Sequence, residues 1–357
     1  MDMIADIAST VFTQFQKPTL AFLIGGMLIA ALGSKLEIPA PVYKFIVILL
    51  LLKVGLGAGI SLREAEFLTL FVPALCAVAL GVGIVVLGSV TLARWRGVSR
   101  IDGLATAGLF GAVSASTLAA GMAVLDTEEI YYEGFIGALY PFMDIAALVT
   151  AIVMARLSAA RAAAPSTQGS GTATLTMGGG SPGRGRVDGF DGTMIRNILV
   201  DTFRSPAISA LLLGLGLGVF TRPDSVYESF YEVLFRGLLS VLMLIMGMEA
   251  WARISELRKV AHSYILYGVA APIIHGLLGF GLGLIAHHVT GFSAGGVVLL
   301  AVMAGSSSDI SGPPTMRGAV PEANPSAYVG TSTGIGTPVA ILSIPLYIAL
   351  AGALIGF

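Results

Sequence analysis

Two polar stretches lie inside apolar segments of the chain. One is GLFGAVSASTLAAG, residues 108–121, and the other is AGSSSDISGPPT, residues 304–315. Proline cannot donate a backbone hydrogen bond, so the adjacent Pro313 and Pro314 require a helix to be interrupted upstream of them. An interrupted helix leaves free N–H groups where one half starts and free carbonyl groups where the other half ends. Both stretches therefore predict broken helices.

Free N–H groups at a helix start bind anions without a cationic side chain, and hydroxyl groups nearby supply further donors. These stretches therefore predict a site for a small oxyanion. Its hydroxyl donors are expected to be Ser114, Ser116, Thr117, Ser306, Ser307 and Ser308. The alternative is that these small residues serve close helix packing or bond carbonyls of their own helix.

Two carboxylates are expected at the same depth as the polar stretches. Asp309 lies within the second stretch, and Asp144 follows Pro141 in YPFMDIAALVT. A carboxylate inside a membrane is costly unless it is paired or hydrated, and it cannot attract an anion. We therefore expect a sodium site whose oxygen ligands are Asp309, Asp144, Ser311, Thr331 and Thr337. The alternative for Asp144 is a structural pair with Lys53.

Composition identifies the surroundings of these residues as a membrane. Of the 357 residues, 55% are hydrophobic and 11% are charged, with a mean hydropathy of +0.88. Soluble domains carry roughly 25% charged residues. Apolar runs of about 20 residues recur, and only helices satisfy the backbone of such runs in lipid. We therefore expect an all-α membrane protein. The net charge of −1 gives no indication of nucleic-acid binding, and the single Cys76 excludes an internal disulfide.

Hydropathy and helix breakers together predict ten transmembrane helices. The expected spans are 18–34, 41–60, 66–94, 102–125, 135–158, 206–221, 231–251, 261–287, 295–320 and 328–355. A Gly-, Ser- and Thr-rich stretch without hydrophobic period separates the fifth span from the sixth. The predicted organisation is an N-terminal repeat over 1–160, a flexible linker over 161–203 and a C-terminal repeat over 204–357.

The two halves resemble each other in sequence. FQKPTLAFLIGGMLIAALG, from Phe15, matches FRSPAISALLLGLGLGVFT, from Phe203, and SAST at 114–117 matches SSSD at 306–309. Because each half has an odd number of spans, five, the second copy is inverted in the membrane. Inverted repeats are typical of transporters, whose substrate site lies near the midplane where the repeats meet. The glycines of LLLGLGLGVF are expected to serve close helix packing.

Basic residues predict the orientation. Of the 20 Lys and Arg residues, 14 fall on the side of the linker, 4 on the other side and 2 inside a span. The positive-inside rule therefore places the linker in the cytoplasm and both termini outside. Bringing an anion into an inside-negative cell costs about 2.3 kcal/mol per 100 mV, so a coupled cation is needed. No nucleotide-hydrolysis motif is visible, which favours secondary transport without a cofactor and without enzymatic activity.

Several motifs together resemble one family of transporters. PTLAFLIGGMLIAALG, GLFGAVSASTLAAG, GALYPFMDIAALVTAIV, LFRGLLSVLMLIMGMEAW, SSSDISGPPT and NPSAYVGTSTGIGTP are similar to the cyanobacterial sodium-dependent bicarbonate transporter family, SbtA. The resemblance implies Na⁺/HCO₃⁻ symport in the plasma membrane as part of a CO₂-concentrating mechanism. It implies a gate (scaffold) domain and a core domain that moves as an elevator within a homotrimer. It also implies a cytoplasmic PII-like regulatory protein, SbtB, as a partner.

In that family bicarbonate lies between the interrupted helices. The resemblance therefore extends the predicted anion site to the backbone of Gly111, Ala112 and Gly305.

Three other functions remain open from the residues alone. One is a sodium-coupled symporter of the same architecture for sulfate or a small organic acid. Another is an intramembrane aspartyl protease with Asp144 and Asp309 as its dyad, although Asp309 follows three serines and not the expected G-x-G-D pattern. A third is an anion channel, in which uptake would persist without sodium.

Overall fold

The computed structural model describes residues 18–63, 67–163, 196, 200, 203–204, 206–257 and 262–357. These residues form helices joined by short loops, and no β-strand occurs among them. Seven helical segments are long and apolar enough to cross a membrane, and three shorter apolar helices accompany them. The predicted all-α, multi-pass membrane fold is confirmed, whereas a total of ten crossings stays a prediction.

The predicted spans coincide with helical segments throughout the described ranges. In chain order these are α2 (Pro18–Ala31), α3 (Ala40–Leu62), α4 (Phe67–Val90), η1 (Leu92–Arg94), α5 (Arg100–Gly111), α6 (Ala115–Thr127), η2 (Gly134–Ala138), α7 (Leu139–Ala163), α9 (Pro206–Phe220), α10 (Asp224–Val226), η3 (Tyr227–Glu232), α11 (Val233–Leu257), α12 (His262–Thr290), α13 (Ala294–Gly305), α14 (Gly312–Ala319), α15 (Pro325–Val329), η4 (Gly330–Gly336) and α16 (Thr337–Leu354). Most of the predicted linker 161–203, with residues 1–17 of the N-terminal repeat, lies outside the described residues.

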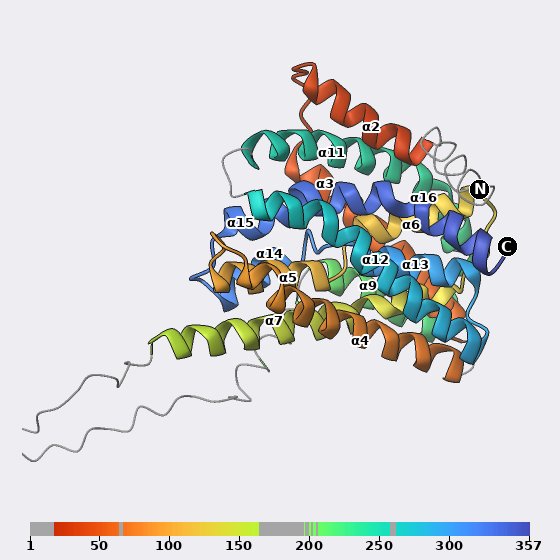
Figure 1. Ribbon diagram of the computed structural model, residues 1–357. Coiled ribbons are helices and arrows are strands. Elements are labelled where there is room, and N and C mark those ends of the chain that lie inside the picture. The colour runs from red at the N-terminus through yellow and green to blue at the C-terminus, as the bar shows by residue number, and fades with distance from the viewer. Residues whose placement is uncertain are drawn as a thin grey trace, which may run out of the picture.

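The helices form two groups. Helices α2 and α11 pack along each other, as do α3 and α9. The second group holds α4, α5 and α7, packed together, and α12, α13 and α16, also packed together. In Figure 1, α2 and α11 lie on one side of the molecule and α4 and α7 on the opposite side. We call α2, α3, α9 and α11 the scaffold group, and α4–α7 with α12–α16 the core group.

Glycines allow the scaffold helices to approach closely. A Cβ on Gly218 of α9 would lie 2.6 Å from the carbonyl oxygen of Leu56 and 2.7 Å from the Cα of Gly59 in α3. Gly26 of α2 and Gly247 of α11 meet the backbone of the opposing helix in the same way. Small residues at such crossings are the usual means of packing helices in lipid. The predicted packing role of the α9 glycines is confirmed at Gly214 and Gly218.

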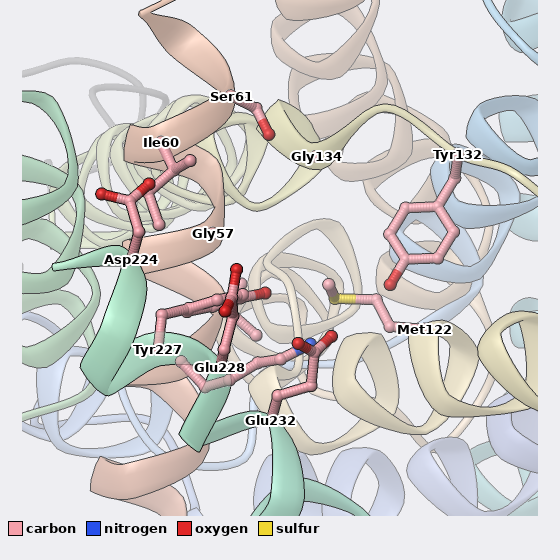
Figure 2. A pocket seen from close by; sticks show the side chains of 12 residues that line it. Gly57, Ile60, Ser61, Met122, Tyr132, Gly134, Asp224, Tyr227, Glu228 and Glu232 are labelled. Atoms are coloured by element: carbon pink, nitrogen blue, oxygen red, sulfur yellow. The ribbon is translucent and has the colours of Figure 1, made fainter. Parts of the chain in front are cut away.

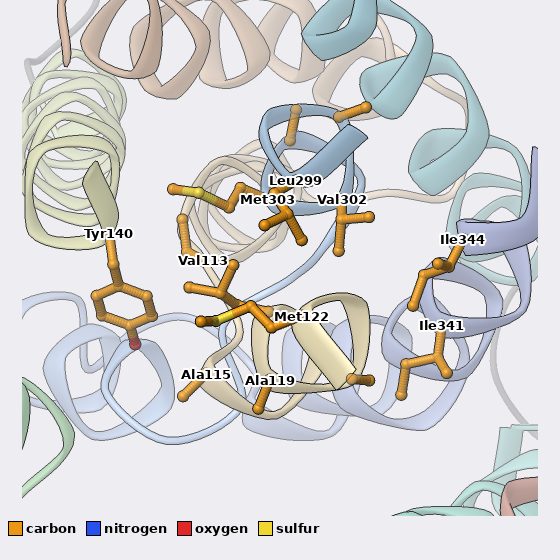
Figure 3. Close-up of a cluster of buried hydrophobic side chains, with 14 of the residues drawn as sticks. Val113, Ala115, Ala119, Met122, Tyr140, Leu299, Val302, Met303, Ile341 and Ile344 are labelled. Atoms are coloured by element: carbon orange, nitrogen blue, oxygen red, sulfur yellow. The ribbon is translucent and has the colours of Figure 1, made fainter. Parts of the chain in front are cut away.

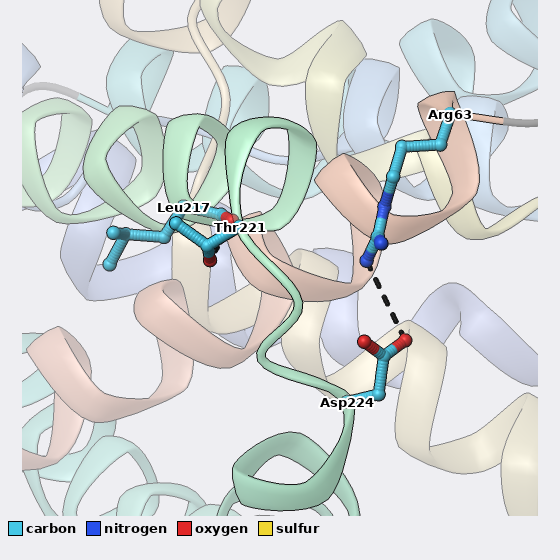
Figure 4. A network of polar contacts seen from close by, with 4 residues as sticks. All are labelled: Arg63, Leu217, Thr221 and Asp224. Atoms are coloured by element: carbon cyan, nitrogen blue, oxygen red, sulfur yellow. Dashed lines mark hydrogen bonds and ion pairs between the residues drawn. The ribbon is translucent and has the colours of Figure 1, made fainter.

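An ion pair joins the end of α3 to the start of α10. Arg63 and Asp224 approach to 3.6 Å, as Figure 4 shows beside the loop that follows Thr221. Both side chains are partly exposed, and exposed pairs contribute about 0–1 kcal/mol. The pair therefore contributes little to the stability of the fold.

Two carboxylates join the two halves of the core group through hydrogen bonds. Glu133, in the loop before η2, accepts hydrogen bonds from the backbone N–H of Ser293 at 2.7 Å and from its hydroxyl at 2.8 Å. Asp102, in the first turn of α5, accepts a hydrogen bond from the N–H of Asn324 at 2.7 Å. Each bond joins the start of α13 or of α5 to a loop of the other half of the chain. The two halves of the core group are therefore joined at two separate places.

We predict that Gly218→Ala destabilises the protein, because the new methyl group would overlap the backbone of α3. Overpacking of this kind costs about 1–3 kcal/mol. Thermal unfolding of the purified protein in detergent should show a lower midpoint for this variant. The control is Gly216→Ala on the same helix, where a Cβ meets nothing within 4 Å. Equal midpoints for the two variants would contradict the packing of α3 against α9.

Candidate functional site

The first predicted interruption lies between α5 and α6. Helix α5 ends at Gly111, the backbone is extended at Ala112 and Ser114, and α6 begins at Ala115. Ser114 is the N-cap of α6, and its Oγ accepts a hydrogen bond from the N–H of Thr117 at 3.1 Å. Serine is a preferred N-cap because its short side chain reaches the first-turn amides. The prediction of a helix break at this stretch is confirmed.

The second interruption lies between α13 and α14. Helix α13 ends at Gly305, Ser306 is extended, and α14 begins at Gly312 with proline in its first turn. The Oγ of Ser308 accepts a hydrogen bond from the N–H of Gly312 at 2.9 Å. Pro313 and Pro314 have no N–H, so α14 begins with few unsatisfied donors. The break is confirmed, but the start of α14 offers fewer amides to an anion than the pattern alone indicated.

The two interruptions contact each other. The N–H of Ser114 donates to the Oγ of Ser306 at 3.0 Å, and the N–H of Ser308 donates to the carbonyl of Leu109 at 2.8 Å. Ser116, in the first turn of α6, donates through its Oγ to the Oδ2 of Asp309 at 2.7 Å. Residues about 190 positions apart in the chain therefore form one polar centre.

Asp144 of α7 forms hydrogen bonds with both interruptions. Its Oδ1 accepts a hydrogen bond from the N–H of Val113, and its Oδ2 accepts one from the Oγ of Ser311, each at 3.2 Å. Ser311 is also 3.0 Å from the Oγ of Ser308. Asp144 is fully buried. Its contacts are with the interruptions, and Lys53 lies instead over the ring of Phe235, so the alternative pairing of Asp144 with Lys53 is not formed.

A second group of oxygens surrounds Ser307. The Oγ of Ser307 donates to the carbonyl of Ser332 at 3.0 Å and lies 3.3 Å from the Oγ1 of Thr337. Ser332 belongs to η4, which is a π-helical turn. Such turns are frequent at functional sites. Ser332 is not among the sodium ligands predicted from the sequence, although the run of small residues in VGTSTGIGTP indicates an irregular segment.

Thr331 does not join either oxygen group through its hydroxyl. Its Oγ1 donates to the carbonyl of Ala327 at 2.7 Å, within its own helical segment. Among the described residues no hydrogen bond connects Thr331 to the other predicted sodium ligands. Its assignment as a sodium ligand stays a prediction, with less support than those of Asp144, Asp309, Ser311 and Thr337.

Apolar side chains enclose the centre. Figure 3 shows Val113 and Met122 beside Leu299 and Met303 of α13, with Tyr140 to the left of this cluster. The serines at 114, 306, 307, 308 and 311 are 0% exposed. An unsatisfied polar group in such surroundings costs about 1–3 kcal/mol, so the hydrogen bonds above hold the interruptions in place.

The centre carries two acids without basic partners. Among the described residues neither Asp144 nor Asp309 forms an ion pair with a lysine or arginine. The oxygens gathered around them are carboxylates, hydroxyls and carbonyls, which are the ligands of hard cations. No group of three or more His, Cys, Asp or Glu side chains within the described ranges fits a metal ion. Carboxylate, hydroxyl and carbonyl oxygens suit a hard cation, whereas imidazole and thiolate ligands suit zinc, copper and iron.

A polytopic helical protein with a polar centre between two interrupted helices has the architecture of a secondary membrane transporter. The chain belongs to the Na⁺-dependent bicarbonate transporter superfamily, since the model of that family matches residues 18–352. A comparison with curated proteins finds no match. The family identifies the protein as a transporter rather than an enzyme, with bicarbonate as its substrate and sodium as the ion on which transport depends.

We predict that Asp144→Ala lowers the midpoint of thermal unfolding, because Val113 and Ser311 both lose their acceptor. Each loss costs about 1–3 kcal/mol. Asp144→Asn should unfold near the wild-type temperature, since its amide oxygen can accept from Val113 while Ser311 turns to accept from its NH₂ group. Thermal unfolding in detergent compares the two. If both variants unfold like the wild type, Asp144 does not hold the interruptions together.

Proposed function

We propose that this transporter is a symporter that holds bicarbonate at the start of α6 and sodium on the oxygens around Asp144 and Asp309. The hydrogen bond from Ser116 to Asp309, at 2.7 Å, carries the proposal. In this bond a hydroxyl in the first turn of α6 has a carboxylate oxygen as its partner, which supports an anion site there because helix starts favour negative charge. Here that oxygen belongs to the protein itself.

The start of α6 has donors for an anion. The amides of Ala115 and Ser116 are in the first turn, where a helix provides no internal acceptor. The hydroxyls of Ser114 and Ser116 lie 2.9 Å apart and border the same position. The start of α14 has fewer donors, because the amide of Gly312 is already bonded. The anion is therefore assigned to α6, with the backbone of residues 111–112 and 305–308 beside it.

Two oxygen groups support the sodium assignment. One consists of Asp144, Ser308 and Ser311, and the other of Ser307, Ser332 and Thr337. In transporters with broken helices, unwound carbonyls and half-helix ends coordinate sodium. We propose that Asp309 completes the first group when sodium is bound.

Coupling then follows from an exchange at Asp309. When sodium draws this carboxylate away from Ser116, the start of α6 becomes available to bicarbonate. Without sodium, Asp309 competes with bicarbonate for the same hydroxyl. Each ion therefore raises the affinity for the other, and by thermodynamic linkage the two factors are equal.

Inverted repeats and an elevator movement form part of the same proposal. The supporting observation is reciprocal packing, since α2 pairs with α11 while α9 pairs with α3, and α3 contacts η2 while α11 contacts η4. Because Asp144 and the serines of the polar centre are 0% exposed, we propose that access to them requires helix movement and that the core group moves against the scaffold group. The proposal includes ten spans, a homotrimer in the plasma membrane, a cytoplasmic linker with both termini outside, and regulation by SbtB.

The function is tested by uptake of labelled bicarbonate into cells that lack their own bicarbonate transporters. Uptake should require sodium and should fall to background when choline replaces it. Excess sulfate should not compete. Uptake that persists without sodium would identify a channel, and competition by sulfate would identify a different anion specificity.

We predict that Ser116→Ala raises the half-saturating bicarbonate concentration about tenfold or more, because a hydrogen bond to a charged group contributes about 1.5–3 kcal/mol. Uptake kinetics measure the change. The control is Ser343→Ala, since Ser343 is a buried serine of α16 whose hydroxyl donates to the carbonyl of Val339 in its own helix. If uptake by Ser116→Ala depends on bicarbonate as in the wild type, the assignment of the anion site to the start of α6 is wrong.

We predict two effects of Asp309→Asn. The half-saturating sodium concentration for uptake should rise, because sodium loses a charged ligand. Bicarbonate should also bind measurably in sodium-free buffer, because a neutral amide competes less for the start of α6. Calorimetry on purified protein measures the binding, with Asp224→Asn as the control. If uptake by Asp309→Asn depends on sodium as in the wild type, sodium does not act by drawing Asp309 away from Ser116.

A further inference from the structure

The turn between α4 and α5 carries three arginines that the proposed transport site does not use. They are Arg94, Arg96 and Arg100, in the sequence LARWRGVSR. The helical segments on either side, Leu68–Arg94 and Arg100–Thr127, are each long and apolar enough to cross a membrane. Because only residues 95–99 separate two such segments, the turn has to lie at the membrane surface, at the depth of the lipid headgroups.

The backbone of this turn is held in place without help from the arginine side chains. The N–H of Val98 donates to the carbonyl of Trp95 at 3.2 Å, which closes the turn. Gly97, the third residue of the turn, has a φ of +80°, a left-handed conformation that favours glycine. The Trp95 ring packs edge-on against Tyr267 of α12, with the ring centroids 6.2 Å apart. The turn is therefore a defined structure that is anchored to the core group.

The three arginines are available to a partner outside the protein. All three are exposed, and within the described ranges none of their side chains forms an ion pair or a hydrogen bond. A guanidinium group presents a planar fork of N–H donors that matches the oxygens of a phosphate. Trp95, between two of the arginines, is partly exposed, and tryptophan is enriched at the depth of lipid headgroups. The turn therefore presents three guanidinium groups where lipid phosphates lie.

This end of the core group has a net positive charge. The Nε of Arg156 donates to the carbonyl of Ala319 at 2.9 Å, and Asp102 at the start of α5 accepts a hydrogen bond from Asn324, so these segments lie at the same end. The arginines described here are Arg94, Arg96, Arg100, Arg156 and Arg317, and the carboxylates are Asp102 and Glu322. Positive charge therefore exceeds negative charge around the turn.

The opposite end of the molecule differs in charge. Helix α4 separates the two ends, so Arg63, which precedes α4, lies away from the turn. Arg63 pairs with Asp224, which borders a cavity of about 240 Å³ (Figure 2). The charged side chains lining this cavity are Asp224, Glu228, Glu232 and Lys53, so its lining has a net negative charge. Attraction of an anionic surface is therefore expected at the α4–α5 turn and not at this cavity.

We propose that the α4–α5 turn binds the headgroups of anionic phospholipids in the adjoining leaflet of the membrane. Basic groups beside a membrane are attracted by its anionic lipids, and each arginine contributes on the order of fivefold to the binding constant. The depth of the turn and the presence of Trp95 favour a lipid surface over an acidic protein as the partner. The inference goes beyond the proposed function, because it does not depend on where bicarbonate or sodium binds.

The first test uses Trp95 as a reporter of the lipid beside it. The chain has two tryptophans, so Trp251→Phe leaves Trp95 alone. The full-length variant is placed in phosphatidylcholine nanodiscs that contain an equal small fraction of either phosphatidylglycerol or phosphatidylcholine brominated on its acyl chains near the headgroup. Brominated phosphatidylglycerol should quench Trp95 more strongly, with a relative binding constant of about fivefold or more. Added salt should reduce this selectivity, because it screens the charges.

The second test changes the arginines in the Trp251→Phe background. Replacement of all three by glutamine, as Arg94→Gln, Arg96→Gln and Arg100→Gln, should reduce the relative binding constant to about one. Replacement of all three by lysine should retain the selectivity, since the positive charge remains. The control carries Arg63→Gln and Arg222→Gln at the opposite end and should quench like the parent protein. Inorganic phosphate should not relieve the quenching by brominated phosphatidylglycerol.

Three outcomes would overturn the proposal. Equal quenching by the two lipids while the arginines are present would exclude lipid selectivity and favour an acidic protein segment as the partner. Selectivity that persists in the glutamine variant would place the lipid elsewhere. Relief of quenching by inorganic phosphate would indicate a site for the free ion. If the glutamine variant does not insert into the membrane, the comparison of the two lipids in the Trp251→Phe protein decides the question.

Discussion

The structure depends on satisfying the backbone polar groups at two helix interruptions inside an apolar protein. In lipid or in a dry core, each unpaired amide or carbonyl is expensive, so irregular backbone survives only where partners exist. Here each interruption supplies partners to the other, through Ser114 with Ser306 and through Ser308 with Leu109. Asp144 supplies acceptors to both sides at once. The serines that satisfy the broken backbone are therefore also the ones proposed to bind ions, because a group that can bond the backbone can also bond an ion.

This mutual satisfaction makes the core a single unit. The start of α6 cannot separate from the 306–311 segment without exposing several buried polar groups together. The braces at Glu133 and Asp102 join the same halves farther out. The scaffold helices, by contrast, contact each other through glycine-lined crossings. A rigid core beside a separately packed scaffold is the mechanical arrangement that movement of one group past the other requires.

Much of this arrangement could be predicted from the sequence, because its causes are local. Apolar length located the helices, and the prolines at 313–314 with the serines before them located an interruption. Contacts between distant residues could not be predicted, since they depend on how helices pack. Nothing in the pattern showed that Asp309 contacts Ser116, that the carbonyl of Ser332 faces Ser307, or that Thr331 bonds its own helix. The scarcity of donors at α14 could have been foreseen, because proline has no N–H and Ser308 is a natural cap for Gly312.

In the proposed mechanism the position of Asp309 determines which combination of ions the site favours. A carboxylate at a helix start is already a bound anion, so a second anion beside it meets repulsion in a medium of low dielectric constant. That repulsion is removed when a cation neutralises the carboxylate, and the combined charge of one sodium and one bicarbonate is zero. Moving a neutral pair avoids the cost of about 2.3 kcal/mol per 100 mV that bicarbonate alone would meet in an inside-negative cell. Under the exchange proposed at Asp309, this carboxylate links the entry of the anion to that of sodium. At a ratio of one to one the net movement of charge is zero, and any further sodium would add a driving force.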